Sequence, residues 1–481
     1  MNNTEVSEHT GRHLSWGQSN CSAVGLSLLL GVGTSAGIQA AEPADHLFIG
    51  DHIITMADDD SKPSALAIRG ERIIWVGDRS DSVAWRDEDT AVHDLGSRAL
   101  LPGFIDAHGH LTYLAATLKW ANLASPPVGE VTSIASLQAT LSRFIADREI
   151  PPGSWVIGNG YDDSLIDEQR HPDRDDLDAV SRDHPIALVH VSGHLMAANS
   201  AALDLVGLDA EMADPPGGHI RRRAGSREPN GVLEETATYP LRGAISQPSG
   251  NPIEDVQAAL GVYARHGITT AQDGAISSAQ AQLLATMDRD DLLTLDIVIF
   301  PIISGLDAVT ADDYAFGGYR KRLKVGGVKL ILDGSPQGKT AYLRDPYEVP
   351  PKGKDASYHG YPIHPPERVN AMVDYYLSAE IPVLAHANGD AAATLLIDAV
   401  AAHLGEQTER DHRTVMIHAQ TVRSDQLDEI ARLGIVPSYF SAHVFFWGDW
   451  HRDSVLGPER AMNISPTRAS IERGIPFTIH N

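Results

Sequence analysis

The segment that most constrains this chain runs from Leu100 to His110 and reads Leu-Leu-Pro-Gly-Phe-Ile-Asp-Ala-His-Gly-His. It is an apolar run that ends in two histidines two positions apart. In a β-strand, alternate side chains lie on one face, so His108 and His110 point the same way at the C-terminal end. Imidazole is a common ligand of zinc and its first-row neighbours. The segment therefore predicts a strand that ends in a pair of metal ligands.

Composition limits what such a chain can be. At 481 residues, with 42% hydrophobic residues, it is long enough for one large domain or two. The formal net charge of −26 argues against binding nucleic acid or an anionic membrane surface. The single cysteine, Cys21, excludes an internal disulfide and a thiolate zinc site. Any metal must therefore be held by His, Asp, Glu or Lys.

Residues 1–41 predict a leader. The apolar core 23–32 is too short to span a bilayer, and small residues follow it at 37–41. We expect a cleaved signal peptide and a periplasmic or secreted protein. Without such cleavage the protein would be cytoplasmic.

Residues 45–100 predict a small β unit ahead of the main domain. Apolar runs lie at 47–49, 53–56, 65–68 and 72–77, and Gly70 to Arg72 forms a hairpin turn. We expect this unit to be the N-terminal portion of a β-sandwich, followed by a second domain over residues 101–481.

Strand-like runs recur along that second domain. After the first run, an insertion of helices and short strands covers about 115–265. The later runs are at 268–273, 295–300, 327–332, 382–386, 414–418, 435–439 and 476–480. With the opening run they make eight, and helical patterns separate several of them. The predicted fold is α/β, a TIM-type (β/α)8 barrel with its chemistry at the C-terminal strand ends.

Titratable residues fall at those strand ends. His386 closes the fifth run and His418 the sixth, so as a pair on adjacent strands they are candidate metal ligands. Lys329 lies within the fourth run. It is either a lysine that extends its ammonium out of an apolar surface or a buried amine of depressed pKa. A buried amine can react with carbon dioxide to form a carbamate that bridges two metals.

The chain from about Leu47 to its end resembles the amidohydrolase superfamily, in particular the amidohydrolase 3 group of YtcJ-like and formamide-deformylase-like hydrolases. The resemblance rests on an ordered series of motifs at 102–110, 190–194, 199–203, 266–270, 329–341, 386–390 and 417–420. In that family such a β unit is half of a sandwich that strands after the barrel complete.

The resemblance implies a site and a reaction. It carries over the metal ligands His108, His110, Lys329, His386 and His418, and it makes His194 a catalytic residue that contacts substrate. The implied cofactor is a divalent metal, one or two zinc ions, with Lys329 carboxylated. Such an ion acidifies a water and polarises a carbonyl while a carboxylate moves the proton, which hydrolyses an amide-type C–N bond other than a peptide bond.

Further substrate-binding candidates come from loops near the strand ends. Tyr161 and Asp162 follow a Gly-Asn-Gly turn, and Lys339 and Gln337 follow the fourth strand. A surface turn is the competing interpretation for Tyr161 and Asp162.

The C-terminal end departs from the family pattern. The resemblance predicts an aspartate, which is both a ligand and the general base, just past the eighth strand, where this sequence ends with Ile479, His480 and Asn481. We therefore expect a truncated chain that lacks this aspartate, the last helix and the closing sandwich strands, and that has weak activity. His480 and Asn481 are possible substitutes, and Asp273 and Asp333 are the first alternative bases to examine.

Three functions are compatible with these motifs. They are a metal-dependent amidohydrolase, a metal-binding regulator or inactive homologue of the same fold, and a hydrolase of lactones or esters. The expected partner is a small-molecule amide, with no nucleic acid and no membrane, and the sequence is compatible with a homo-oligomer.

Overall fold

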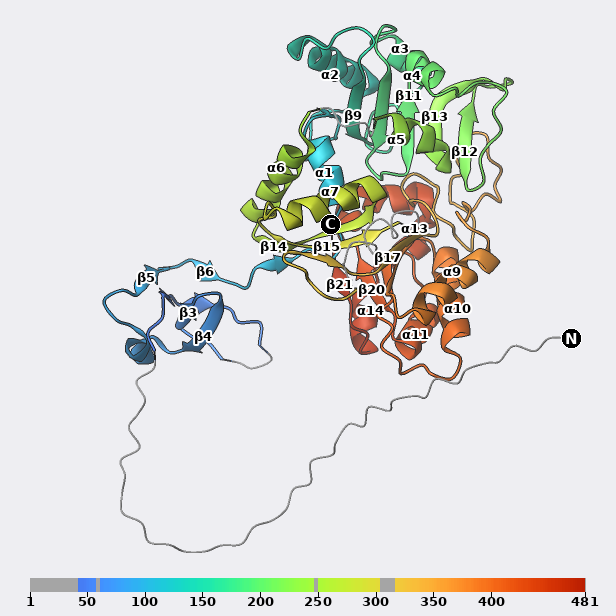
Figure 1. Ribbon diagram of the computed structural model, residues 1–481. Coiled ribbons are helices and arrows are strands. Elements are labelled where there is room, and N and C mark those ends of the chain that lie inside the picture. The colour runs from blue at the N-terminus through green and yellow to red at the C-terminus, as the bar shows by residue number, and fades with distance from the viewer. Residues whose placement is uncertain (1–41, 58–60, 246–249, 303–315, 481) are drawn as a thin grey trace, which may run out of the picture. The chain divides into compact units, whose positions relative to one another are not determined.

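The computed structural model describes residues 42–57, 61–245, 250–302 and 316–480 (Figure 1). The predicted signal peptide lies outside the described residues. The chain divides into two compact units, residues 1–102 and 103–481.

The first unit contains a four-stranded sheet in the order β4-β3-β1-β5 and a two-stranded ladder of β2 with β6. Their bounds are β1 His46–Ile49, β2 His52–Ile53, β3 Ala65–Arg69, β4 Arg72–Gly77, β5 Ala91–Asp94 and β6 Ala99–Leu100. β3 and β4 pair antiparallel, as the hairpin turn at Gly70 predicts. Leu47, Ala65 and Ala67 are buried in a small core. The β unit is present, and its membership of a sandwich stays a prediction.

In the second unit, each of the eight runs expected to form the barrel contains a strand. These are β7 Phe104–Ile105, β14 Ile268–Ile276, β15 Asp296–Pro301, β17 Val328–Ile331, β18 Val383–Ala387, β19 Val415–His418, β20 Val436–Tyr439 and β21 Thr478–Ile479. A ninth strand, β16 Leu323–Val325, was not expected. All neighbouring strands in these sheets are parallel. The α/β class of the fold is therefore as predicted.

These strands form two sheets rather than one closed barrel. The orders are β16-β15-β14-β7 and β17-β18-β19-β20-β21, and a parallel bridge between Ile302 and Lys329 links them on one side. Within the described residues no ladder joins β7 to β21, and each of these strands is only two residues long. Strands this short offer few backbone groups for pairing, so closure of the barrel is not confirmed.

Helices cover the two sheets. Those of the barrel region are α1 Leu111–Thr117, α6 Pro252–Arg265, α7 Ser278–Arg289, α9 Pro366–Ser378, α10 Asp390–Leu404, α11 Ser424–Leu433, α12 Ala442–Trp450, α13 Gly457–Ala461 and α14 Thr467–Glu472. In α11, Leu427, Ile430 and Leu433 recur three residues apart and are all buried, as an amphipathic helix on a sheet requires. No helix in the described ranges has the length and apolar character needed to cross a membrane.

The insertion builds a sheet of its own, drawn in green in Figure 1. The order is β12-β13-β11-β10-β9-β8, with β8 Ala121–Asn122, β9 Val156–Tyr161, β10 Ile186–His190, β11 Leu195–Ala198, β12 Gly218–Arg222 and β13 Pro229–Glu235. Its helices are α2 Ile134–Asp147, α3 Arg174–Asp178, α4 Ser200–Leu205 and α5 Tyr239–Ile245. β9 and β10 are parallel neighbours, so residues after their C-terminal ends lie at one edge of this sheet.

Candidate active site

The four predicted histidine ligands lie at or just beyond the C-terminal ends of parallel strands, and the predicted lysine lies inside a strand. His386 and His418 are on β18 and β19, Lys329 is on β17, and His108 and His110 follow β7. Gly274 lets His108 approach β14, because a Cβ atom at this position would lie 2.2 Å from His108 Cε1. Parallel strands bring such ends to one edge of a sheet, which is why residues so far apart in sequence can meet.

All five side chains meet in one cluster. The His108 ring centroid lies 4.9 Å from that of His110 and 5.8 Å from that of His418. The His386 and His418 ring centroids are 4.7 Å apart. Lys329 Nζ lies 3.3 Å from His108 Nε2. We call these five residues the histidine cluster.

His480, which follows β21, also lies against the histidine cluster. Its Nε2 atom is 3.0 Å from His418 Nδ1, and its ring centroid is 5.2 Å from that of His108. Its Nδ1 atom lies 2.9 Å from Ser438 Oγ. A role of His480 as a substitute ligand stays a prediction, and Asn481, the other candidate, lies outside the described residues.

Burial disfavours positive charge on the side chains of the cluster. Desolvation lowers the pKa of His108, His386 and His418 well below the ordinary value, and Lys329 or neighbouring histidines lower them further. The pKa of His110 falls to about 3 for the same reasons. Burial lowers the pKa of Lys329 to about 7. Neutral imidazoles and a partly neutral amine have free lone pairs, so this donor set fits a divalent metal ion.

Two side chains behind the cluster orient its imidazoles. His108 Nδ1 lies 2.9 Å from Gln272 Oε1, and His386 Nδ1 lies 3.1 Å from Asp333 Oδ1. In each pair the oxygen accepts a hydrogen bond from Nδ1–H, which leaves Nε2 with its lone pair. Such outer partners fix the tautomer and ring orientation of ligating histidines.

The two alternative bases, Asp273 and Asp333, are already engaged by hydrogen bonds. Asp333 accepts from the backbone N–H groups of Tyr342, Asn388 and Gly389, and burial raises its pKa to about 7. Asp273 Oδ2 accepts from the backbone N–H and the hydroxyl of Thr112, and burial raises its pKa to about 6. Both carboxyls are therefore held in fixed positions.

His194, the predicted substrate contact, lies beside the cluster. Its ring centroid is 4.6 Å from that of His386, and its Nδ1 atom is 2.8 Å from Glu235 Oε2. The buried Glu235 has a φ of 49°, a left-handed conformation that is costly for a residue with a side chain and is held only where surrounding structure imposes it. Because Glu235 accepts from Nδ1–H, His194 Nε2 has a free lone pair.

An inner cavity of about 290 Å³ opens beside His194, His386 and His418. Its walls are largely apolar and include Phe440, Phe446 and Trp447. Asp162 also lines it and accepts a hydrogen bond of 2.6 Å from Trp447 Nε1.

Unpaired polar atoms also line the inner cavity. Ser335 Oγ, Gln337 Oε1 and Asn388 Oδ1 are buried and have no hydrogen-bond partner among the described residues. A buried polar atom without a partner is unfavourable, so these atoms are suited to polar groups of a bound molecule.

An outer cavity of about 1560 Å³ shares Leu165, Gln337 and Phe446 with the inner one. Lys339 lines the outer cavity, donates to Val349 O and Ser454 Oγ at 2.7 Å each, and has its pKa lowered to about 8 by burial.

Tyr161 is fully buried and belongs to the lining of neither cavity. Its hydroxyl faces His171 Nδ1 at 3.3 Å. The structure therefore separates the four predicted substrate contacts, with His194 and Asp162 at the inner cavity, Lys339 at the outer one and Tyr161 beneath the surface.

Comparison with known proteins assigns the family. The profile described as the amidohydrolase family matches residues 91–481, which is most of the chain. The chain belongs to the amidohydrolase family. This membership and the geometry above support hydrolase activity.

Amidohydrolase relatives match along nearly the whole chain. The N-substituted formamide deformylase of Arthrobacter pascens is 26% identical over 462 residues, which cover 90% of this chain and 80% of the relative. The amidohydrolase YtcJ of Bacillus subtilis is 25% identical over 451 residues, which cover 89% of this chain and 78% of the relative. A metal-dependent hydrolase from Pyrococcus furiosus has a similar fold, with a TM-score of 0.65 at 23% identity over 91% of this chain and 85% of its own.

Sequence reasoning missed the orienting partners Gln272 and Glu235. Both carried a weak signal, because Gln272 is a polar residue inside an apolar strand and Glu235 ends the buried strand β13. A polar residue in such a position needs a partner, although sequence alone does not say which one.

Proposed function

We propose that this amidohydrolase-family protein is a metal-dependent hydrolase of amide-type C–N bonds other than peptide bonds. The observation that carries the proposal is the histidine cluster, in which four imidazoles and Lys329 Nζ gather beside a cavity. Burying several polar side chains together costs desolvation free energy. A purely structural role would not require such a donor set.

His108, His110, His386 and His418 would hold a divalent metal, which we propose to be zinc. A bound ion of this kind polarises a carbonyl and acidifies water. Lys329 would join them either as an amine or as a carbamate. The carbamate would allow a second ion, because its two oxygens can each bind one.

The strand order also supports a barrel as the scaffold that presents these ligands at one end.

His194 and Glu235 would handle the proton. His194 Nε2 has a lone pair because Nδ1–H is donated to Glu235, so the imidazole can accept a proton and return it to the leaving amine. Glu235 would stabilise the imidazolium that forms in between. His194 faces the inner cavity, which puts this imidazole within reach of a bound amide.

The inner cavity would set the substrate. Its aromatic walls suit an apolar substituent, while Asn388 Oδ1 and Gln337 Oε1 are acceptors that suit the N–H of an amide. Asn388 Nδ2 donates to Gly334 O at 3.0 Å, which fixes the amide so that Oδ1 is the free atom. We therefore expect secondary or primary amides, N-formyl amides among them, to be better substrates than tertiary ones.

The test is hydrolysis of a panel of N-formyl and N-acyl amides, with matched esters and lactones, by zinc-loaded protein and by protein stripped with a chelator. Zinc-dependent turnover of amides supports the proposal. Turnover confined to esters or lactones would assign the site to that bond class instead. Tight zinc binding at the cluster with no turnover on any of them would favour a regulatory role.

Carboxylation of Lys329 can be measured separately from activity. Protein prepared with ¹³C-bicarbonate should show a carbamate carbon signal by NMR that is absent in Lys329→Met. Lys324→Met is the matched control, because Lys324 lies on β16 and its ammonium sits 5.6 Å from the Tyr319 ring. A signal that persists in Lys329→Met would rule out carboxylation at this lysine.

A further inference from the structure

A second group of ligand-type side chains lies outside the histidine cluster. Asp163, His171 and His190 each offer one ligand atom, and these atoms lie within 4.8 Å of one another. Asp163 Oδ1 is 3.0 Å from His190 Nε2, and Asp163 Oδ2 is 3.4 Å from His171 Nε2. We propose that these three side chains bind a second divalent cation of the zinc type, with one coordination position open to the outer cavity. We call this group the His–Asp–His site.

The fold of the insertion brings the three residues together. β9 and β10 are parallel neighbours in which Tyr161 pairs with His190. Asp163 therefore follows one strand end beside His190 at the other, and His171 arrives from the loop that precedes α3. The site is thus built on the ends of two adjacent strands, the same principle that assembles the histidine cluster on a different sheet.

Each histidine has an oxygen behind it. His190 Nδ1 lies 2.8 Å from Ser192 Oγ, and His171 Nδ1 lies 3.3 Å from the Tyr161 hydroxyl. If each Nδ1–H donates to its hydroxyl oxygen, both Nε2 lone pairs face Asp163. Ligating histidines are held in this way by an outer partner. The arrangement also explains why Tyr161 is buried rather than in a pocket.

The charges suit a divalent cation. Asp163 supplies a carboxylate, and His171 and His190 supply imidazoles, which zinc accepts together as ligands. The neighbouring Arg221 is paired with Glu234 Oε1 at 2.6 Å, which offsets its repulsion of a cation.

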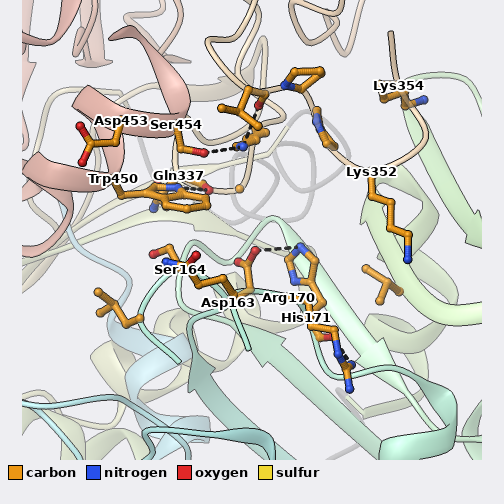
Figure 2. Close-up of a pocket in the computed structure, with 18 of the residues that line it drawn as sticks. Asp163, Ser164, Arg170, His171, Gln337, Lys352, Lys354, Trp450, Asp453 and Ser454 are labelled. Carbon is orange, nitrogen blue, oxygen red and sulfur yellow. Dashed lines mark hydrogen bonds and ion pairs between the residues drawn. The ribbon is translucent and has the colours of Figure 1, made fainter. Parts of the chain in front are cut away.

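The open position is supplied by the outer cavity. Asp163 and His171 line this cavity of about 1560 Å³ (Figure 2). His190, on strand β10, is fully buried. Zinc held by three protein ligands takes a water or another ligand as its fourth. In Figure 2 the Asp163–His171 pair faces the space between Trp450 and Lys352, so an anionic group of a ligand in the cavity could complete the coordination.

The competing structure is a hydrogen-bonded triad without metal. The backbone N–H of Ser192 lies 3.2 Å from His190 Nδ1, and if it donates there, His190 Nε2–H donates to Asp163. In that case the three side chains brace the cavity wall and bind no ion. The two possibilities differ in metal content, which is measurable.

The experiment is to load the full chain with zinc, dialyse it, and measure zinc per chain by mass spectrometry for the wild type, Asp163→Asn, His171→Gln and His219→Gln. We expect the first two variants to lose one equivalent. His219 is the matched control, because it lines the same cavity and pairs with Asp214 outside the site. Unchanged zinc in both Asp163→Asn and His171→Gln would overturn the proposal and assign the hydrogen-bonded triad.

A second measurement does not depend on these variants folding. In His386→Asn, whose substitution lies in the histidine cluster, we expect a cobalt titration to retain one tight equivalent with the absorption of a low-symmetry site. No tight cobalt in this protein would overturn the second site. Undiminished zinc in His386→Asn would instead count against the metal ligation proposed for the histidine cluster, so the failures of the two proposals are distinguishable.

Discussion

Oδ1 of Asp333 lies 3.1 Å from Nδ1 of His386, and three backbone N–H groups hold the same carboxylate in place. The pair links the end of β17 to the end of β18. The orientation of one proposed ligand therefore depends on a residue that need not touch the metal.

Replacement of Asp333 by asparagine should weaken zinc binding about 10- to 100-fold. An asparagine has one acceptor oxygen where Asp333 has two, and these two accept from three backbone N–H groups as well as from His386, so the hydrogen bond that fixes the tautomer of His386 is weakened. Competition with a chromophoric chelator measures this affinity. Asp374→Asn is the control, since Asp374 makes the same kind of contact with His403 at 2.9 Å on an exposed surface. Equal affinities in the wild type and Asp333→Asn would show that the contact does not orient a ligand.

Gly274→Ala should also impair metal binding. The added Cβ atom would lie 2.2 Å from His108 Cε1 and 2.5 Å from its Nδ1 atom, so the ring must move and its bond to Gln272 must break. We expect a zinc affinity at least tenfold lower, by the same competition assay. Gly261→Ala provides the comparison, because a Cβ atom there meets nothing within 4 Å and lies in α6, where alanine is favoured. A normal affinity in Gly274→Ala would mean that His108 has room that the structure does not show.

The buried Lys329 makes the stability of the metal-free protein depend on pH. Its pKa falls from 10.5 to about 7 on folding, so between these values the unfolded chain binds more protons than the folded one and stability rises with pH. Below about pH 7 both states carry the proton, and the full cost of burying the ammonium, on the order of a few kcal/mol, opposes folding.

Lys329→Met removes that cost. Urea unfolding of the metal-free proteins should show the variant more stable than the wild type at pH 7, and the difference should shrink as the pH approaches 10. A difference that is constant over this range would mean that Lys329 titrates in the folded chain as it does in the unfolded one.

Glu235→Gln tests the proton-handling pair. A glutamine keeps the shape but stabilises the imidazolium of His194 less well, so kcat on an amide substrate should fall about 10²- to 10⁴-fold with KM little changed. Zinc content should stay at the wild-type value. Glu234→Gln is the comparison, because the neighbouring carboxylate pairs with Arg221 and Tyr361 instead. A large rise in KM with kcat preserved would assign Glu235 to substrate binding.

The sequence was most informative where chemistry and periodicity coincide. His386 and His418 each close an apolar run, and because parallel strands share one end, their proximity follows from the pattern of strands. The same reasoning brought in Lys329, whose apolar run left two interpretations open, a buried amine and a lysine that reaches solvent, and the structure buries it. The predicted α/β class needed only the alternation of strands and helices.

Other features depend on contacts that no local pattern encodes. The His–Asp–His site joins residues from two strand ends and a loop, and His171 in its sequence context looks like an ordinary loop histidine. Closure of a barrel depends on pairing between β7 and β21, which are two residues each, and such short runs carry little pairing information. β16 was missed for the same reason, since only three residues form it.

Asp162 and Asp163 are consecutive residues, yet one lines the inner cavity and the other the outer cavity. A single peptide unit thus forms part of the partition between the two chambers. Asp162 accepts a hydrogen bond from the Trp447 indole, which is itself part of the wall of the inner cavity. The partition therefore joins a wall residue of the larger chamber to a wall residue of the smaller one through a single peptide bond.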